Sequence, residues 1–136
     1  MKNQRGFSLM EVLIAITLIA LFGAGAAAGF KRIQAGAKVK KAREDIKMLG
    51  QAVDRFEMDN GQYPEGLKDL VENPGELPDY APGGYLDKGK MPVDPWKHDY
   101  SYEKSGGDKG AAYDIVSPGA DGQEGTDDDV RLSKLE

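Results

Sequence analysis

The sequence predicts an α+β protein in which one long N-terminal α-helix packs on a small antiparallel sheet of about three strands. Three observations support this fold class. A helical pattern of apolar residues extends from residue 7 to about 59, a stretch rich in proline and glycine follows, and three short strand-like segments lie near the C-terminus. A chain of 136 residues accommodates one small domain beside such a helix.

The composition excludes several function classes. A net charge of −5 argues against a nucleic-acid-binding surface. The chain contains no cysteine, which excludes a disulfide framework and a thiolate site. What remains is a small acidic protein whose apolar N-terminus indicates targeting to a membrane.

The apolar N-terminal run contains an isolated glutamate. Between Phe7 and Phe30 the only charged side chain is Glu11, and basic residues flank the run on both sides. About 20 apolar residues span a bilayer core of about 30 Å, so the run is long enough for a transmembrane anchor. A secretory signal peptide is a second interpretation, with Ala-x-Ala cleavage sites within residues 24–28. Neither interpretation explains a carboxylate that costs about 2.5–3.5 kcal/mol at the centre of a bilayer.

Cleavage of the chain between Gly6 and Phe7 would explain the presence of Glu11 in the apolar run. Phe7 then carries a new α-amine, a cation with a pKa of about 7.7–8.0. Glu11 lies four residues further on, about 6 Å along a helix axis and near the membrane interface. In an assembly, the amine of one copy can pair with Glu11 of a neighbouring copy. In this third interpretation the glutamate directs self-association.

The stretch "RGFSLMEVLIAITLIAL" resembles the prepilin motif of type IV pilins and type II secretion pseudopilins. The resemblance implies that residues 1–6 are a leader, which a prepilin peptidase removes after Gly6. It further implies that Phe7 is N-methylated and that Glu11 is needed for assembly. Residues 7–30 would form the hydrophobic transmembrane and assembly helix, and residues 31–136 a globular domain in the periplasm.

Beyond residue 31 the apolar residues thin out but keep a helical period. Their spacing of 3, 4, 3, 4 and 3 defines one stripe of an amphipathic helix, formed by Val39, Ala42, Ile46, Leu49, Val53 and Phe56. The charged residues between them form a solvated face. The stripe has fewer than three heptads, which favours packing on a sheet over a homodimeric coiled coil. Gly61 and Pro64 predict the end of the helix.

The rest of the chain predicts short elements. Residues 67–73 suggest a short helix, and residues 74–96 a surface loop anchored to the core by Tyr80, Tyr85, Met91 and Trp96. A binding groove around Trp96 is the alternative interpretation of that residue. Three strands are predicted at residues 100–104, 111–117 and 129–133, with a hairpin turn at 105–110.

Three blocks extend the resemblance over nearly the whole chain: "DNGQYPEGLKDLVENP", "GYLDKGKMPVDPW" and "YDIVSPGADGQEGTDDDV". They are similar to the type II secretion major pseudopilin. This implies a pilin-like fold and a structural fibre subunit that assembles through its N-terminal helix to drive export of folded proteins. It implies a single-pass inner-membrane protein that assembles into a periplasmic pseudopilus. Its partners would be further copies of itself, minor pseudopilins and the inner-membrane secretion platform.

Two other functions remain open at this point. One is a type IV pilin-like surface fibre subunit for adhesion or DNA uptake. The other is a membrane-anchored protein that binds calcium through the acidic segment 121–129 and does not polymerise. This segment, which resembles the pseudopilin calcium loop, and the missing cysteines favour the secretion fibre over the surface pilin, because many true pilins close their C-terminal region with a disulfide. Glu11 favours both fibres over the lone anchored protein.

The second candidate site is an acidic loop near the C-terminus. Five acidic residues fall within nine positions: Asp121, Glu124, Asp127, Asp128 and Asp129. Such a cluster is either a solvated acidic turn or a cation site, and the loop glycines allow carbonyl groups to turn inward. The spacing does not fit an EF-hand. The resemblance to pseudopilins implies a calcium site with side-chain ligands Asp121, Asp128 and Asp129 and carbonyl ligands Pro118 and Thr126.

An enzymatic function is not expected. His98 is the only histidine, and it lies in a loop. No serine lies in a nucleophile-elbow context, and we find neither a metal-hydrolase ligand set nor a phosphate-binding glycine loop.

Overall fold

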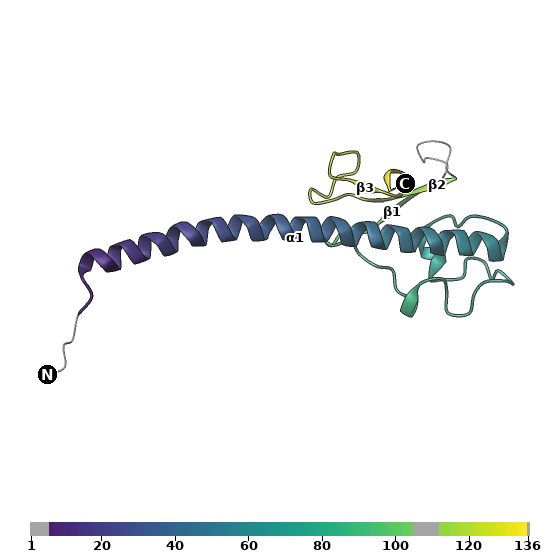
Figure 1. Ribbon diagram of the computed structural model, residues 1–136. Coiled ribbons are helices and arrows are strands. Elements are labelled where there is room, and N and C mark those ends of the chain that lie inside the picture. The colour runs from purple at the N-terminus through teal and green to yellow at the C-terminus, as the bar shows by residue number, and fades with distance from the viewer. Residues whose placement is uncertain (1–5, 105–111, 136) are drawn as a thin grey trace. The chain divides into compact units, whose positions relative to one another are not determined.

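The computed structural model describes residues 6–104 and 112–135, with the side chains of 24–28 outside this description. One helix, α1 (Leu9–Asn60), precedes three strands, β1 (Ser101–Lys104), β2 (Tyr113–Ser117) and β3 (Val130–Arg131) (Figure 1). Three short 3-10 turns lie at Leu67–Leu70, Asp87–Gly89 and Leu132–Lys134. The chain divides into two compact units, Met1–Ala37 and Lys38–Glu136, and α1 contributes to both.

In the first unit, α1 displays its apolar side chains. Large apolar residues from Phe7 to Ile33 are exposed, including Leu9 at 80% and Phe22 at 73%. The helix is continuous through the glycines of this segment. Among the helical residues whose side chains the structure describes, no stretch is both long and apolar enough to cross a membrane.

In the second unit, the apolar stripe of α1 forms the core, which confirms the predicted period. Ala42, Ile46, Leu49 and Val53 are completely buried, and Phe56 is 1% exposed. The helix ends one residue beyond the predicted position. The following residue is Gly61, whose φ of 71° lets its N–H donate to the carbonyl of Glu57 at 2.8 Å. This is the left-handed cap that glycine provides without steric cost.

The three strands form one antiparallel sheet in the order β1-β2-β3. Tyrosines from the sheet region attach it to α1. The Tyr113 hydroxyl donates to the Asp54 carboxylate at 2.7 Å, and the Tyr100 hydroxyl donates to the buried carboxylate of Asp45 at 3.1 Å. The predicted fold class of a long helix on a three-stranded sheet is therefore confirmed. The predicted hairpin turn at 105–110 lies outside the described residues.

Two predicted elements are much shorter in the structure, while β1 and β2 begin one and two residues after their predicted starts. The third strand was predicted over 129–133 but covers only Val130–Arg131. Ser133 leaves the ladder because its N–H and its hydroxyl both donate to the Asp114 carboxylate, at 3.0 and 2.9 Å. The helix predicted over 67–73 is one 3-10 turn, Leu67–Leu70. Pro74 disfavours a helical conformation at the residue before it, so the turn does not extend.

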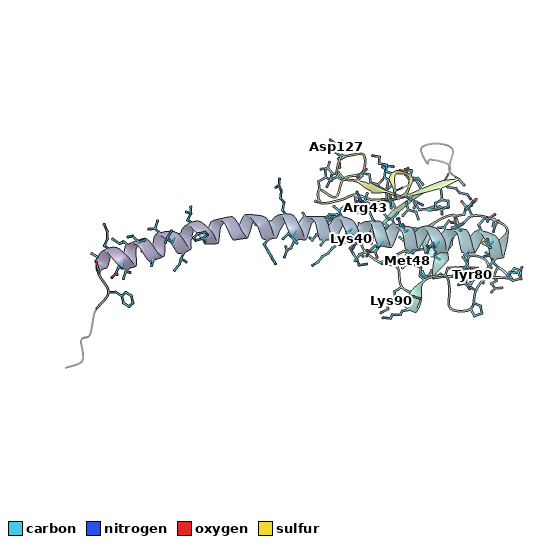
Figure 2. All side chains as sticks on the ribbon, viewed as in Figure 1. Lys40, Arg43, Met48, Tyr80, Lys90 and Asp127 are labelled. Atoms are coloured by element: carbon cyan, nitrogen blue, oxygen red, sulfur yellow. The ribbon has the colours of Figure 1, made fainter. Side chains whose placement is uncertain are left out.

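The loop 74–96 is anchored as predicted. All four predicted anchors are partly buried against the core: Tyr80, Tyr85, Met91 and Trp96. The rings of Tyr80 and Tyr85 pack edge to face with centroids 5.2 Å apart, and both contact the Phe56 ring. Figure 2 labels Tyr80 beside the C-terminal half of α1. Because aromatic side chains anchor this loop to the core, it does not depend on helices or strands. It therefore tolerates many proline and glycine residues, which disfavour both.

Candidate functional site

The N-terminal candidate site lies at the first turn of α1. The backbone N–H of Ser8 donates to Glu11 Oε2 at 2.8 Å, while the backbone N–H of Met10 donates to Ser8 Oγ at 3.2 Å. The Glu11 bond is one half of a capping box, and the Ser8 hydroxyl caps the second helical residue, so the two side chains satisfy N–H groups that the helix leaves free. Glu11 thus binds backbone within its own chain. The sequence signal for this role, Ser-x-x-Glu before an apolar run, was not used in the prediction.

The other two predicted residues of this site are accessible. Phe7 is 88% exposed, and no described atom lies within 4 Å of the position that a Cβ on Gly6 would occupy. The predicted cleavage junction therefore lies just before the first residue of α1, next to an exposed side chain. Glu11 lies one turn away, on the exposed surface of α1.

The acidic loop connects β2 to β3 and turns on three glycines. Gly119, Gly122 and Gly125 have φ values of 67°, 71° and 90°, as expected for a backbone that curls inward. At Gly119 the available space is also limiting, because a Cβ there would collide with the backbone and carboxylate of Asp128. Asp127, labelled in Figure 2, is exposed on this loop.

Asp121 and Asp128 bind the loop backbone. Asp128 Oδ2 accepts the N–H groups of Ala120 and Asp121 at 2.6 and 3.1 Å, and its Oδ1 is 2.6 Å from the Thr126 hydroxyl. The Thr126 hydroxyl and these N–H groups hold the pKa of Asp128 below its ordinary value, so it is ionised at neutral pH. Asp121 Oδ1 accepts the N–H of Gln123 at 2.8 Å. Backbone hydrogen bonds to these two carboxylates therefore hold the loop in its curled conformation.

Asp129 is the most enclosed of the predicted ligands. Its side chain is 1% exposed, and its Oδ2 accepts the Gly125 N–H at 2.8 Å and an Arg131 N–H at 3.3 Å. Its Oδ1 is buried and has no hydrogen-bond partner among the described residues. A buried carboxylate oxygen without a partner is costly, and such atoms are rare in folded proteins. A bound cation would satisfy this oxygen.

The predicted carbonyl ligands lie at the two ends of the loop. The Gly119 N–H donates to Ser117 Oγ at 3.3 Å, and Ser117 Oγ donates to buried Asp94 at 2.7 Å. Because the peptide between Pro118 and Gly119 is planar and trans, the Pro118 carbonyl points away from Ser117 Oγ. At the other end, the Thr126 carbonyl accepts the N–H of Asp129 at 3.4 Å.

Three further residues support this loop and were not predicted. Asp94 is 2% exposed and accepts the N–H groups of Trp96 and His98 at 2.9 and 2.8 Å. His98 Nδ1 lies 3.1 Å from the Gly119 carbonyl, which makes His98 a turn residue that braces the loop. Arg131 lies within 4 Å of three carboxylates. The pairing of Arg131 with Asp114 had a weak signal in the sequence. Two of the predicted strands each carry one of these two residues, and their charges are opposite.

Metal-site geometry is not complete in the described part of the chain. There, no group of three or more histidine, aspartate or glutamate side chains converges on a point that could hold a metal ion. The five predicted ligands lie on one loop, but their carboxylates bind backbone N–H groups and Arg131. The calcium ligand set stays a prediction.

Two known families match the sequence. The family "Type II secretion system (T2SS), protein G" matches residues 30–133, and the "Prokaryotic N-terminal methylation motif" matches residues 1–27. The chain is similar to type II secretion system core protein G of Vibrio cholerae, with 38% identity over 92% of this chain and 86% of the relative. The corresponding Escherichia coli K12 protein is 36% identical over 94% of this chain and 90% of the relative.

A solved structure shows the same fold. The crystal structure of the major pseudopilin from the type 2 secretion system of enterohaemorrhagic Escherichia coli matches with a TM-score of 0.64 and 33% identity. The match covers 79% of this chain and 94% of that one. These matches name a secretion-machine component and a pseudopilin, in agreement with the expectation of a structural protein and not an enzyme. The chain therefore belongs to the type II secretion system protein G family, the family of the major pseudopilin.

Proposed function

We propose that this chain is the main subunit of a periplasmic secretion fibre and assembles through the exposed apolar face of α1. The observation that carries the proposal is a helix segment with large apolar residues exposed along its length and one carboxylate in its first turn. Removal of residues 1–6 places the α-amine of Phe7 at the start of this segment. An amine from one copy and Glu11 from the next then form an ion pair. The match to an N-terminal methylation motif supports this processing.

The same segment is the proposed membrane anchor. Before assembly, lipid covers the apolar side chains of residues 7–30, and Lys31 and Arg32 mark one end of the buried stretch. The domain 31–136 then lies in the periplasm. The proposed partners are further copies of this chain, a prepilin peptidase, minor pseudopilins and the inner-membrane secretion platform.

The test separates the charge of Glu11 from its role as a helix cap. Glu11→Gln keeps an oxygen that can accept the Ser8 N–H but removes the charge that a neighbouring amine needs. Ser8→Ala is the matched control, because it weakens the cap and leaves the charge in place. We expect Ser8→Ala to form fibres and Glu11→Gln to form few or none. The measurement is electron microscopy of sheared fibres after co-expression with a prepilin peptidase.

Intact-mass analysis of the same samples tests the processing step. We expect an N-terminus at Phe7 that carries one additional methyl group. Retention of Met1, or a start within residues 24–30, would contradict the proposed cleavage. Equal fibre yields from Glu11→Gln and wild type would show that the ion pair is not the assembly contact, even if cleavage is correct.

We further propose that the acidic loop binds calcium through the carboxylates of Asp121, Asp128 and Asp129 and the carbonyls of Pro118 and Thr126. Two features of the loop support this site. The buried Asp129 Oδ1 lacks a partner within residues 6–104 and 112–135, and the Pro118 carbonyl is turned away from Ser117. Mixed carboxylate and carbonyl oxygens on a flexible loop suit calcium, whereas magnesium requires near-ideal octahedral geometry. The cation would neutralise the loop and link the start of β3 to the end of β2.

Thermal melting of the detergent-solubilised full chain tests the calcium site. We expect calcium to raise the melting temperature relative to EGTA, with a smaller effect from equimolar magnesium. Asp128→Asn should reduce the calcium shift, because an amide keeps the N–H acceptor but removes the charge. Glu124→Gln is the control, since Glu124 is an acid of the same loop outside the predicted ligand set. A wild-type melt that is identical in calcium and EGTA would refute the site.

A further inference from the structure

One guanidinium group faces three carboxylates from separate parts of the sheet region. Arg131 Nη1 lies 3.6 Å from Glu103 on β1 and 3.5 Å from Asp114 on β2, and Nη2 lies 3.3 Å from Asp129 at the end of the acidic loop. The Arg131 side chain is 19% exposed, while the side chains of Asp114 and Asp129 are 2% and 1% exposed. Arg131 therefore compensates buried charge, in contrast to a surface ion pair.

The three carboxylates depend on Arg131 to different degrees. Asp114 also accepts the N–H groups of Ile115 and Ser133 and the Ser133 hydroxyl. Glu103 is 40% exposed, so its carboxylate is open to solvent. Among the residues that the structure describes, Asp129 has the Gly125 N–H as its one other partner, and its Oδ1 has none. The carboxylate with the fewest other donors is thus the one that belongs to the proposed calcium site.

We propose that Arg131 is a built-in cation that holds Asp129 in place without calcium and thereby reduces the dependence of the acidic loop on calcium. This inference rests on the proposed calcium site. Arg131 and a calcium ion would act on the same buried carboxylate, one from each side of it. Arg131 and calcium would each neutralise part of the Asp129 charge, so either cation weakens the attraction of the carboxylate for the other. The two cations would also repel one another. Their contributions to stability are therefore coupled, and the coupling is reciprocal.

Reciprocal coupling makes the inference measurable. If Arg131 partly replaces calcium, the loss of its charge matters more in EGTA than in saturating calcium. By the same relation, calcium binds more tightly when the charge of Arg131 is removed. A purely structural role, in which Arg131 only cross-links the strands, predicts equal losses in both conditions and an unchanged calcium affinity.

The experiment compares three variants of the detergent-solubilised full chain. Arg131→Gln removes the charge, Arg131→Lys keeps it with poorer geometry, and Glu103→Gln removes the charge of the Arg131 partner on β1, which is outside the predicted calcium ligands. Melting temperatures are measured in EGTA and in saturating calcium, and calcium affinity is measured by titration calorimetry. We expect Arg131→Gln to bind calcium about fivefold or more tightly and to show a larger calcium-induced shift than wild type. Arg131→Lys and Glu103→Gln should stay close to wild type.

Each outcome decides between the possibilities. Arg131→Gln that is folded in calcium but unfolded in EGTA supports the inference. Equal destabilisation in both conditions, unfolding in both, or weaker calcium binding overturns it, because calcium then does not replace the guanidinium. If wild type shows no calcium response, the calcium site and this inference both fail. If wild type responds and Arg131→Gln responds equally, only the inference about Arg131 fails.

Discussion

The two parts of α1 use apolar residues in opposite ways. In the first unit, Leu13 is 48% exposed and Ile19 is 70% exposed. In the second unit, Ile46 and Leu49 are completely buried on the same helix. The residue types are alike, so the difference depends on what the chain supplies to cover them. Only the second unit has a sheet and an anchored loop to pack on its apolar stripe.

Because of this difference, the two parts of α1 are stabilised in different ways. The second unit buries its apolar surface within one chain, so its core residues determine its own free energy of unfolding. The exposed apolar surface of the first unit contributes only when lipid or another copy covers it. Substitutions in the two parts of α1 should therefore appear in different measurements.

The largest expected effect comes from equivalent leucine substitutions in the two units. Leu49→Ala should lower the free energy of unfolding of the second unit by about 2–5 kcal/mol, because it leaves a cavity in the core. Leu13→Ala should change that free energy by less than about 0.5 kcal/mol. Thermal melting followed by near-UV circular dichroism measures this, since Trp96 and all six tyrosines lie in the second unit. Similar losses from both substitutions would show that the two parts of the helix unfold together.

Alkaline pH should act on the second unit alone. Burial raises the pKa of Tyr102 to about 12, and burial also raises the pKa values of Tyr100 and Tyr113. The folded state favours the neutral phenol, so this stability is complete below the unfolded pKa of about 10 and is lost as the pH rises towards 12. The near-UV signal should disappear in this range while the helical signal of the first unit persists.

Tyr102→Phe is the control for the alkaline transition. The Tyr102 hydroxyl is buried and has no hydrogen-bond partner in the described part of the chain, so its removal eliminates a titrating group at little cost to the neutral fold. We expect the alkaline midpoint of this variant to rise. A midpoint that falls would show that the hydroxyl has a stabilising partner in solution.

The smallest expected effect distinguishes two helical glycines. Alanine at Gly36 would meet no described atom within 4 Å, so it should stabilise the helix by about 0.5–1 kcal/mol through backbone entropy. Alanine at Gly50 would place its Cβ 3.2 Å from Leu132 Cδ2, and this crowding should offset most of the gain. Hydrogen exchange of the flanking amides measures both changes. A larger gain at Gly50 than at Gly36 would mean that Leu132 moves freely.

Sequence periodicity predicted the fold where burial follows from a repeated pattern. The stripe that includes Ala42, Ile46 and Phe56 and the αL cap at Gly61 were both visible as spacing. The end of β3 was not, because Ser133 leaves the ladder for the Asp114 carboxylate, a residue 19 positions away. A single polar contact between distant residues has no period and leaves no local signal.

The candidate sites were predicted to a similar extent. The acidic loop was recognised because five acids in nine positions are unusual, and its glycines curl as expected. The capping role of Glu11 was missed, although Ser8 three residues earlier carried the signal. Asp94 and Arg131 could not be assigned, because their contacts with the loop depend on how the turn before β1 and the strand β3 meet it. Such contacts arise from tertiary packing and are absent from any short stretch of sequence.

The small size of the sheet has a consequence for aggregation. In the described part of the chain, one edge of the sheet is β3, with two residues, and the other is β1, whose four residues end in Glu103 and Lys104. A long apolar edge strand is a template on which other chains add strands and grow into amyloid-like deposits. Edges this short and charged offer few free backbone groups for such growth. Copies of this domain can therefore be crowded together without merging their sheets.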